Sequence, residues 1–328
     1  MIGRRALLAA AATSATGAGA AFAAGAPTTT LTAVDVHPSD YPTVEAVRWI
    51  GDELERETDG RFAIRIYPGG QLGAETDTVA LTRFQVLDIC RVTAAALNNI
   101  FPLTQALTMP YVFRDEAHMR RVSDGDVGRE VLASFQARGL VGLCIYDGGI
   151  RSMYNVRRPI HTPADMHGLK VRVPRSDMFM RMIDAMGANA TPIPFGEVFT
   201  GLQTHLIDGA ENNWATYQST RQYEVARYWS ETHHAASPDI LLFSKARFDA
   251  MRRADRDLLM AKAAESVAVM RELWDAKQTA ARETVLSAGV AANGVERAAF
   301  ERAVAPVKRR YAQDAALAAL LRRIEQHA

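Results

Sequence analysis

The feature that most restricts how this 328-residue chain can fold is one long segment without helix-breaking residues. Residues 254–288 contain neither glycine nor proline, and apolar side chains recur along them at helical spacing: Leu259, Ala263, Val267, Met270 and Trp274. The pattern predicts a single helix, on the order of 50 Å long at about 1.5 Å per residue. Such a helix is longer than one small domain is wide. We therefore expect two domains, with the helix contacting both and the chain crossing between them more than once.

The first 23 residues have the pattern of a cleaved export signal. Two arginines, Arg4 and Arg5, precede a run of small and apolar residues that ends in an A-x-A cleavage pattern at 21–23. The apolar run is shorter than the roughly 20 strongly apolar residues of a membrane span, which disfavours an uncleaved anchor. The arginine pair leaves the general secretory route and the twin-arginine route both open. No second long apolar run follows, so we expect a periplasmic protein.

Composition excludes several functional classes. Apolar residues make up 48% of the chain and charged residues 23%, as in an ordinary folded protein rather than a disordered one. The formal net charge is +1 and becomes −1 once the two arginines of the signal are removed. Nucleic-acid-binding proteins carry a clustered excess of lysine and arginine. A nearly neutral chain without basic blocks is therefore not expected to bind nucleic acid.

Strand and helix patterns alternate through the first half of the chain. Residues 31–36 form a short β-rich run, a helical pattern begins at Pro42 and stops at Gly60, and residues 61–67 alternate strictly. Strand, helix and strand in this order are the βαβ unit of α/β proteins. Further strands are predicted at 86–92, 140–146 and 169–173. We find no internal sequence repeat.

Motifs of the common enzyme and cofactor classes are missing from the sequence. There is no nucleotide-binding glycine loop, no G-x-S-x-G nucleophile elbow, no H-E-x-x-H and no C-x-x-C. We therefore expect neither an enzyme nor a cofactor or metal site. Cys90 and Cys144 lie in apolar strands and are interpreted as small buried side chains, with a periplasmic disulfide as the alternative. The neighbours His233 and His234 would diverge on a helix, which disfavours a shared metal ion.

Arginines at strand ends are the strongest sign of a binding function. Arg151 follows the predicted strand 140–146 after two glycines, and Arg172 lies within the strand 169–173. Arginine suits the bidentate capture of a carboxylate, although a structural ion pair or a solvated strand face explains either arginine equally well. Residues 208–217 concentrate amides, acids and aromatics after a helix. This composition suits a polar small-molecule pocket, or a capped turn.

Three ordered motifs resemble the core signature of the solute-binding proteins of TRAP transporters, the DctP family. They are GLKVRVP at 168–174, GANATPIPFGEVFTGLQ at 187–203 and IDGAENN at 207–213. The similarity extends from HPSDYP at 37–42 and PGGQLGAE at 68–75 to the long late helix, so it covers nearly the whole mature chain. Two positions depart from the family pattern. Gly201 stands where alanine is more usual, and His205 stands where glycine is frequent.

The resemblance implies a two-domain α/β periplasmic binding protein with crossing segments that closes on a ligand held between its domains. The boundaries expected for this chain are 27–149 with 237–277 for domain I, and 150–236 with 278–328 for domain II. The ligand cleft would lie between them, and the long helix would touch both.

The same resemblance implies which residues bind the ligand. Arg172 would hold the ligand carboxylate, with Asn212 beside it and Arg151 as a second arginine of the cleft. Phe195 would form an apolar wall. Three residues of the first domain would set ligand identity: His37, Glu75 and Arg91.

Four short segments resemble the subgroup that binds sugar acids such as glucuronate and galacturonate. They are His37-Pro38, LNN at 97–99, DGGIR at 147–151 and NNWATY at 212–217. A polyhydroxylated acid would place its carboxylate on the arginines and its hydroxyls on Glu75, His37 and the asparagines. The alternatives are a C4-dicarboxylate or 2-oxo acid in the same role and, more distantly, a periplasmic enzyme acting on a sugar acid. The implied partners of a monomeric binding protein are the small and large membrane subunits of a TRAP transporter.

Overall fold

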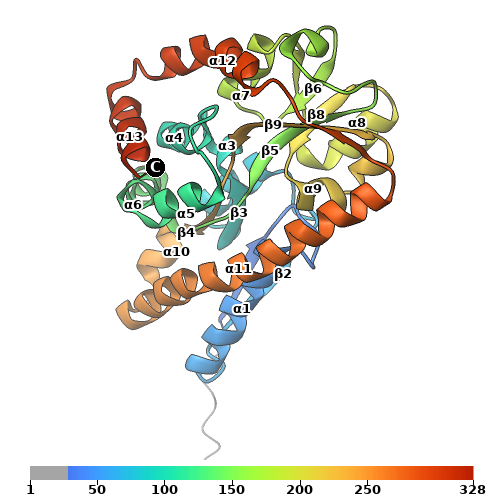
Figure 1. Cartoon of the computed structure of the whole chain (residues 1–328). Helices are drawn as coiled ribbons and strands as arrows, with labels where there is room; N and C mark the ends of the chain where they lie inside the picture. Colours follow the sequence, from blue (N-terminus) through green and yellow to red (C-terminus); the bar gives the residue numbers. More distant parts are fainter. Residues whose placement is uncertain (1–28, 328) are drawn as a thin grey trace, which may run out of the picture.

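The computed structural model of the chain describes residues 29–327, and the predicted signal peptide at 1–23 lies outside the described residues. Residues 29–327 form two β-sheets, each covered by helices on both faces (Figure 1). We call each sheet with its helices a lobe. The arrangement confirms the predicted two-domain α/β fold. None of the helices in this part of the chain is both long and apolar enough to cross a bilayer.

The first lobe is built on a five-stranded sheet. Its order is β2 (Phe62–Tyr67), β1 (Thr29–Val34), β3 (Ile89–Thr93), β10 (Asp239–Ser244) and β4 (Leu140–Tyr146). β1 pairs in parallel with β2 and β3, whereas β10 runs antiparallel between β3 and β4. A strand from late in the sequence therefore completes the sheet that the early strands begin.

The second lobe is built on a six-stranded sheet. Its order is β11 (Ala291–Asn293), β9 (Tyr228–Ala236), β5 (Ile150–Asn155), β8 (Gly209–Asn212), β6 (Lys170–Val173) and β7 (Asn189–Pro192). β6 pairs in parallel with β7 and β8, and β5 runs antiparallel to both β8 and β9. The chain passes between the two sheets at 147–149, between β4 and β5, and at 237–238, between β9 and β10.

Apolar side chains on both faces of the first sheet bind its helices. One face packs against α1 (Pro42–Glu57), α10 (Lys245–Ala250) and the first part of α11 (Arg253–Ser287). The helices on the other face are α2 (Glu75–Arg83), α3 (Ala94–Leu97), α4 (Gln105–Thr108), α5 (Glu116–Asp124), α6 (Asp126–Ser134) and α13 (Ala315–Gln326). α1 follows the expected pattern, because Val44, Val47, Ile50 and Leu54 form its buried stripe.

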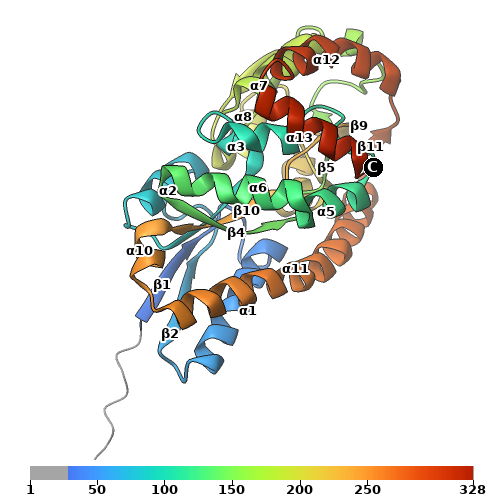
Figure 2. The same cartoon turned by 90° about the vertical axis from the view of Figure 1, so that its left-hand side faces the viewer.

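The second sheet is covered in the same way. α7 (Asp177–Ala185) and α12 (Arg297–Tyr311) pack on one face. α8 (Val198–Gln203) and α9 (Trp214–Ser219) pack on the other, together with Val285 near the end of α11. Figure 2 shows α11 running from the first lobe toward the second. The predicted long helix is confirmed to within one residue at each end, and so is its contact with both lobes.

The helix α13 packs on the first lobe, whereas the predicted boundaries assign its residues to domain II. All strands of each sheet lie inside the segments expected for domains I and II. α13, however, packs its buried face, Leu317, Leu320 and Ile324, into the core of the first lobe beside α4 and α6 (Figure 1). The boundaries stay a prediction, and we propose that domain I also includes residues 315–326.

Two predicted strands differ from the observed ones at their ends. β1 ends at Val34 instead of residue 36, because the Asp35 carboxylate accepts a hydrogen bond from the His37 amide and turns the chain. β3 begins at Ile89 instead of residue 86, because Gln85 adopts the left-handed conformation with φ of 64°. Alternation of apolar residues does not reveal either local turn.

The two lobes repeat one strand and helix unit. β1-α1-β2-α2-β3 and β6-α7-β7-α8-β8 each place the first strand in the middle, parallel to the other two. Each unit turns into its last strand through a left-handed residue, Gln85 or His205, with φ of 64° and 58°. Glycine adopts this conformation most readily, which accounts for the frequent glycine of the family at the position of His205. This structural repeat has no counterpart as a repeat in the sequence.

We predict that Trp274→Ala lowers the free energy of unfolding by about 3–5 kcal/mol, because it opens a cavity in the core that joins α11 to the first sheet. Trp274 is fully buried. The measurement is urea unfolding followed by far-UV circular dichroism. Leu273→Ala is the matched control on the same helix, since Leu273 is exposed, and it should change the free energy by less than about 1 kcal/mol. Equal effects of the two substitutions would contradict the packing described for α11.

Candidate functional site

A narrow cleft lies between the two lobes, where strands of both sheets end. In α/β proteins, ligands bind outside the carboxyl ends of parallel strands. β1, β3, β6 and β8 all direct this end toward the cleft, through residues at or just beyond their last positions. All seven residues predicted for the site line this one cleft: His37, Glu75, Arg91, Arg151, Arg172, Phe195 and Asn212. Their role in binding a ligand stays a prediction.

Arg172 is the cleft arginine that lacks an acidic partner. It lies in β6 and is buried, with 5% of its surface exposed. Its Nε donates a hydrogen bond to the Ile193 carbonyl at 3.0 Å, and Nη1 and Nη2 have no hydrogen-bond partner within residues 29–327. No ion pair of Arg172 is formed in that range either. Burial lowers the pKa of Arg172, and the nearby Glu211 carboxylate offsets this only in part. A bound carboxylate would supply the missing partner.

Arg151, by contrast, is neutralised by the protein. It lies in β5 and pairs with Glu211 of the neighbouring strand β8, with Nε–Oε2 at 2.5 Å and Nη2–Oε1 at 2.9 Å. Its Nη1 donates to Asn212 Oδ1 at 2.9 Å. Burial opposes ionisation of Glu211, yet the Arg151 guanidinium lowers the pKa of Glu211 to about 2. Arg151 therefore positions Asn212 and contributes little free charge to the cleft.

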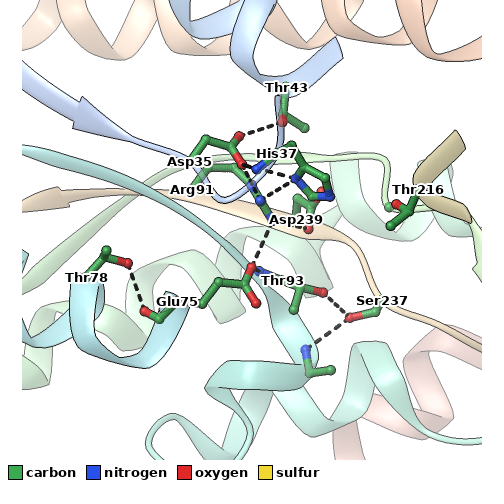
Figure 3. A network of polar contacts seen from close by, with 12 residues as sticks. Asp35, His37, Thr43, Glu75, Thr78, Arg91, Thr93, Thr216, Ser237 and Asp239 are labelled. Atoms are coloured by element: carbon green, nitrogen blue, oxygen red, sulfur yellow. Dashed lines mark hydrogen bonds and ion pairs between the residues drawn. The ribbon is translucent and has the colours of Figure 1, made fainter. Parts of the chain in front are cut away.

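Arg91 is the most heavily compensated of the three arginines. It lies in β3 and forms ion pairs with Asp35, with Glu75 at 3.0 Å and with Asp239 at 3.1 Å (Figure 3). Its Nη2 also contacts His37 Nδ1. Despite burial, the three carboxylates raise its pKa well above the ordinary value. Arg91 thus holds the carboxylates of the first lobe in place. It lies in the middle of β3, whereas Glu75 is the first residue of α2 and His37 lies in the loop between β1 and α1.

Aromatic rings form the apolar part of the cleft and connect its two sides. The His37 ring stacks on Tyr41 with centroids 3.9 Å apart, and it lies 5.2 Å from the Phe195 ring of the second lobe. The Tyr41 hydroxyl is 2.8 Å from Thr216 Oγ1, also in the second lobe. Phe195 begins a short 3-10 helix, Phe195–Glu197, directly before α8. Phe195 lines the cleft, and its role as an apolar wall for a ligand stays a prediction.

Six polar lining residues were missed as individual site residues by sequence reasoning: Tyr41, Thr93, Asn213, Thr216, Ser237 and Asp239. Tyr41, Asn213 and Thr216 lie inside segments that the sequence analysis singled out, so a signal for them existed. Asp239 had none, because it stands at the start of an otherwise apolar strand. Burial raises the pKa of Asp239 despite its pairing with Arg91.

The cysteine and histidine predictions have definite outcomes. Cys90 and Cys144 are free and buried, which confirms the interpretation as small core side chains and excludes the disulfide. His233 and His234 lie on strand β9, not on a helix, so the predicted helical divergence is wrong. His234 Nε2 is 3.4 Å from Glu211 Oε2 and completes the buried group around Arg151. Within 29–327, no group of three or more acidic, histidine or cysteine side chains could hold a metal ion.

Two α/β lobes with a charged cleft between them define the class of two-lobe binding proteins. Residues 33–314 match the family described as bacterial extracellular solute-binding protein, family 7, also called DctP. The chain belongs to this family, as the sequence motifs predicted. It is a solute-binding protein of the TRAP transport type, a family of extracytoplasmic binding proteins rather than enzymes.

Three solved structures illustrate how similar the fold is. A TRAP periplasmic solute-binding protein of a Bradyrhizobium species, in complex with α/β-D-galacturonate, has 43% identity and a TM-score of 0.89 and covers 91% of this chain and 100% of its own. One from Xanthobacter autotrophicus Py2, with bound β-D-galacturonate, has 42% identity and a TM-score of 0.88, covering 90% and 99%. One from Pseudomonas putida F1, with bound D-glucuronate, has 33% identity and a TM-score of 0.88, covering 90% and 97%.

We predict that Glu211→Gln destabilises the protein by about 3–5 kcal/mol near neutral pH, because it leaves the buried Arg151 charge without its partner. The folded-state pKa of Glu211, about 2, lies below the ordinary value of 4.5. The contribution of ionised Glu211 to the free energy of unfolding is therefore complete above about pH 4.5 and is lost as the pH falls toward 2. The difference between wild type and variant, measured by urea unfolding across this range, should shrink on acidification.

Glu301→Gln is the control for this experiment, since Glu301 pairs with Arg297 on the surface and both side chains are nearly half exposed. It should cost less than about 1 kcal/mol at any pH in the range. If the effect of Glu211→Gln were equally small, or independent of pH, the buried pair would not have the role described.

Proposed function

We propose that the protein captures a hexuronate, such as glucuronate or galacturonate, and delivers it to a TRAP-type membrane transporter. The observation that carries the proposal is the buried Arg172 guanidinium, whose two terminal nitrogens have no hydrogen-bond partner within residues 29–327. The three similar structures were solved with galacturonate or glucuronate bound. Arg172 would bind the carboxylate in a bidentate manner, with Asn212 beside it.

The other predicted residues take complementary roles in this proposal. Glu75 and His37 would bind ligand hydroxyls, and Phe195 would cover an apolar face of the ligand. Arg91 and Arg151, already paired with carboxylates, would position Glu75 and Asn212. A dissociation constant of 1 μM requires only about 8 kcal/mol in total. One bidentate arginine and several hydroxyl contacts in a closed cleft can supply this.

Closure of the lobes would make the carboxylate contact strong. A solvent-exposed ion pair contributes only about 0–1 kcal/mol, whereas charge-assisted hydrogen bonds strengthen when water leaves the cleft. The ligand would stabilise the closed state because it contacts both lobes only there. The small and large membrane subunits would then recognise the closed form of a monomeric binding protein. Export to the periplasm would use the signal at 1–23, by the general secretory or the twin-arginine route.

A panel of acids tests the ligand class by thermal shift. We expect glucuronate or galacturonate to raise the melting temperature, because a bound ligand stabilises the folded state. Succinate, malate and pyruvate represent the alternative of a C4-dicarboxylate or 2-oxo acid. If these raise the melting temperature and no sugar acid does, the hexuronate proposal is wrong. Recovery of the bound acid chemically unchanged would separate binding from the more distant alternative, an enzyme acting on a sugar acid.

We predict that Arg172→Ala weakens hexuronate binding by about 100-fold or more, because it removes a buried charge-assisted bidentate contact. Arg172→Lys keeps the charge but loses the planar fork, and it should bind with intermediate affinity. Isothermal titration calorimetry measures both. Arg157→Ala, which removes a surface arginine of the same lobe paired with Asp208, is the control and should bind as wild type does. Binding by Arg172→Ala within about threefold of wild type would refute the central role of Arg172.

A further inference from the structure

The cleft wall of the first lobe presents an excess of negative charge. Arg91 is its only buried cation with a fixed charge, and it faces three carboxylates: Asp35, Glu75 and Asp239 (Figure 3). The other titratable groups of this wall are His37, which lies between Asp35 and the Phe195 ring, and Tyr41, on which His37 stacks. Both carboxylate oxygens of Asp35 accept hydrogen bonds from within the lobe. The donors are Arg91, the Thr43 hydroxyl and the His37 amide. Glu75 and Asp239 line the cleft itself.

Each of these two carboxylates keeps one oxygen unused. Glu75 Oε1 accepts hydrogen bonds from Arg91 at 3.0 Å and from the Thr93 amide at 3.0 Å. Asp239 Oδ1 accepts from Arg91 at 3.1 Å. Glu75 Oε2 and Asp239 Oδ2 have no hydrogen-bond donor within residues 29–327. The first wall therefore offers acceptors to a ligand.

The opposite wall offers donors. Arg172 Nη1 and Nη2 have no partner in the described part of the chain, and Asn212 uses its Oδ1 on Arg151 and the Asn213 amide while Nδ2 has none. With Glu211 neutralising Arg151, the second wall keeps one net positive charge. A carboxylate accepts hydrogen bonds but cannot donate them, whereas a hydroxyl can do both. A ligand carboxylate thus fits the second wall only, and hydroxyls fit the first.

We propose that Glu75 and Asp239 are specificity determinants that restrict the cleft to acids with a single carboxylate and exclude dicarboxylates of the same length. A second carboxylate at the far end of the ligand would lie against the two carboxylates of the first wall. Like charges brought together in a buried site strongly disfavour the wrong ligand. This inference rests on the proposed capture of a hexuronate through Arg172. It adds that hexuronates and aldonates, which have one carboxylate, bind, whereas aldarates, which have two, do not.

The test compares two open-chain acids that differ at one end only. L-Galactonate and galactarate share the same hydroxyls, and galactarate carries a second carboxylate where L-galactonate has a CH2OH group. Calorimetric titration of the full mature chain should give at least about 100-fold weaker binding for galactarate. Binding of galactarate within about tenfold of L-galactonate would overturn the proposal. D-Galacturonate and D-glucuronate are titrated alongside, and failure of every one of these acids to bind would refute the proposed function itself.

Isosteric variants separate charge from shape. Glu75→Gln and Asp239→Asn keep an oxygen that can accept from Arg91 but remove the negative charge, so in the double variant galactarate should gain affinity relative to L-galactonate by about tenfold or more. Asp255→Asn is the matched control, because Asp255 is a buried carboxylate paired with Arg61 and Arg252 outside the cleft. It should leave the ratio unchanged.

A wild-type circular dichroism spectrum, together with a cooperative urea unfolding transition, establishes that the double variant is folded. If galactarate binds the wild type too weakly to measure, the test is whether galactarate binds the double variant. Gain of measurable galactarate binding supports the charge rule, and a folded double variant that still excludes galactarate overturns it.

Discussion

The site depends on how three buried arginines obtain their counter-charges. A guanidinium cannot give up its proton in a protein, so burial is tolerable only where carboxylates or other acceptors replace water. Arg91 receives three carboxylates and Arg151 receives Glu211, all from the chain itself. Arg172 receives a single backbone carbonyl. Arg172 is therefore the one of these three arginines that has no carboxylate partner among the described residues. In our proposal, the ligand carboxylate is that partner.

This distribution also explains why net charge is uninformative for this chain. The described cleft contains both signs, and its chemistry arises from their separation onto two walls. The first lobe supplies acceptors from α2 and β10, and the second supplies donors from β6 and β8. Two lobes that approach each other can thus bind one polar molecule from opposite sides with opposite hydrogen-bonding character. A single lobe presents only half of this pattern.

Much of the fold could be predicted from the sequence, because the relevant signals are local. The 35-residue helix α11 follows from uninterrupted helical periodicity, and β2 from strict alternation. The seven residues predicted for the cleft all line it. They were predicted from the motif resemblance, because hydrophobic periodicity does not identify binding residues. The counter-charges could not be predicted. Glu211 is 60 residues from Arg151 and Asp239 is 148 residues from Arg91, so the pairing exists only once the strands are ordered in their sheets. The docking of α13 on the first lobe could not be predicted for the same reason. The left-handed turns at Gln85 and His205 are local, but the periodicity of apolar residues does not reveal them.

The place of β10 in the first sheet has a consequence for how the chain acquires its structure. β10 lies between β3 and β4, so the strands made first remain in two separate groups until residues 239–244 are available. α13 then closes the core of that lobe with the last residues of the chain. Contacts between segments so distant in sequence form slowly, because the intervening loop must close first. The five-stranded sheet of the first lobe is therefore completed only after β5, β6, β7, β8 and β9 of the second lobe have been synthesised.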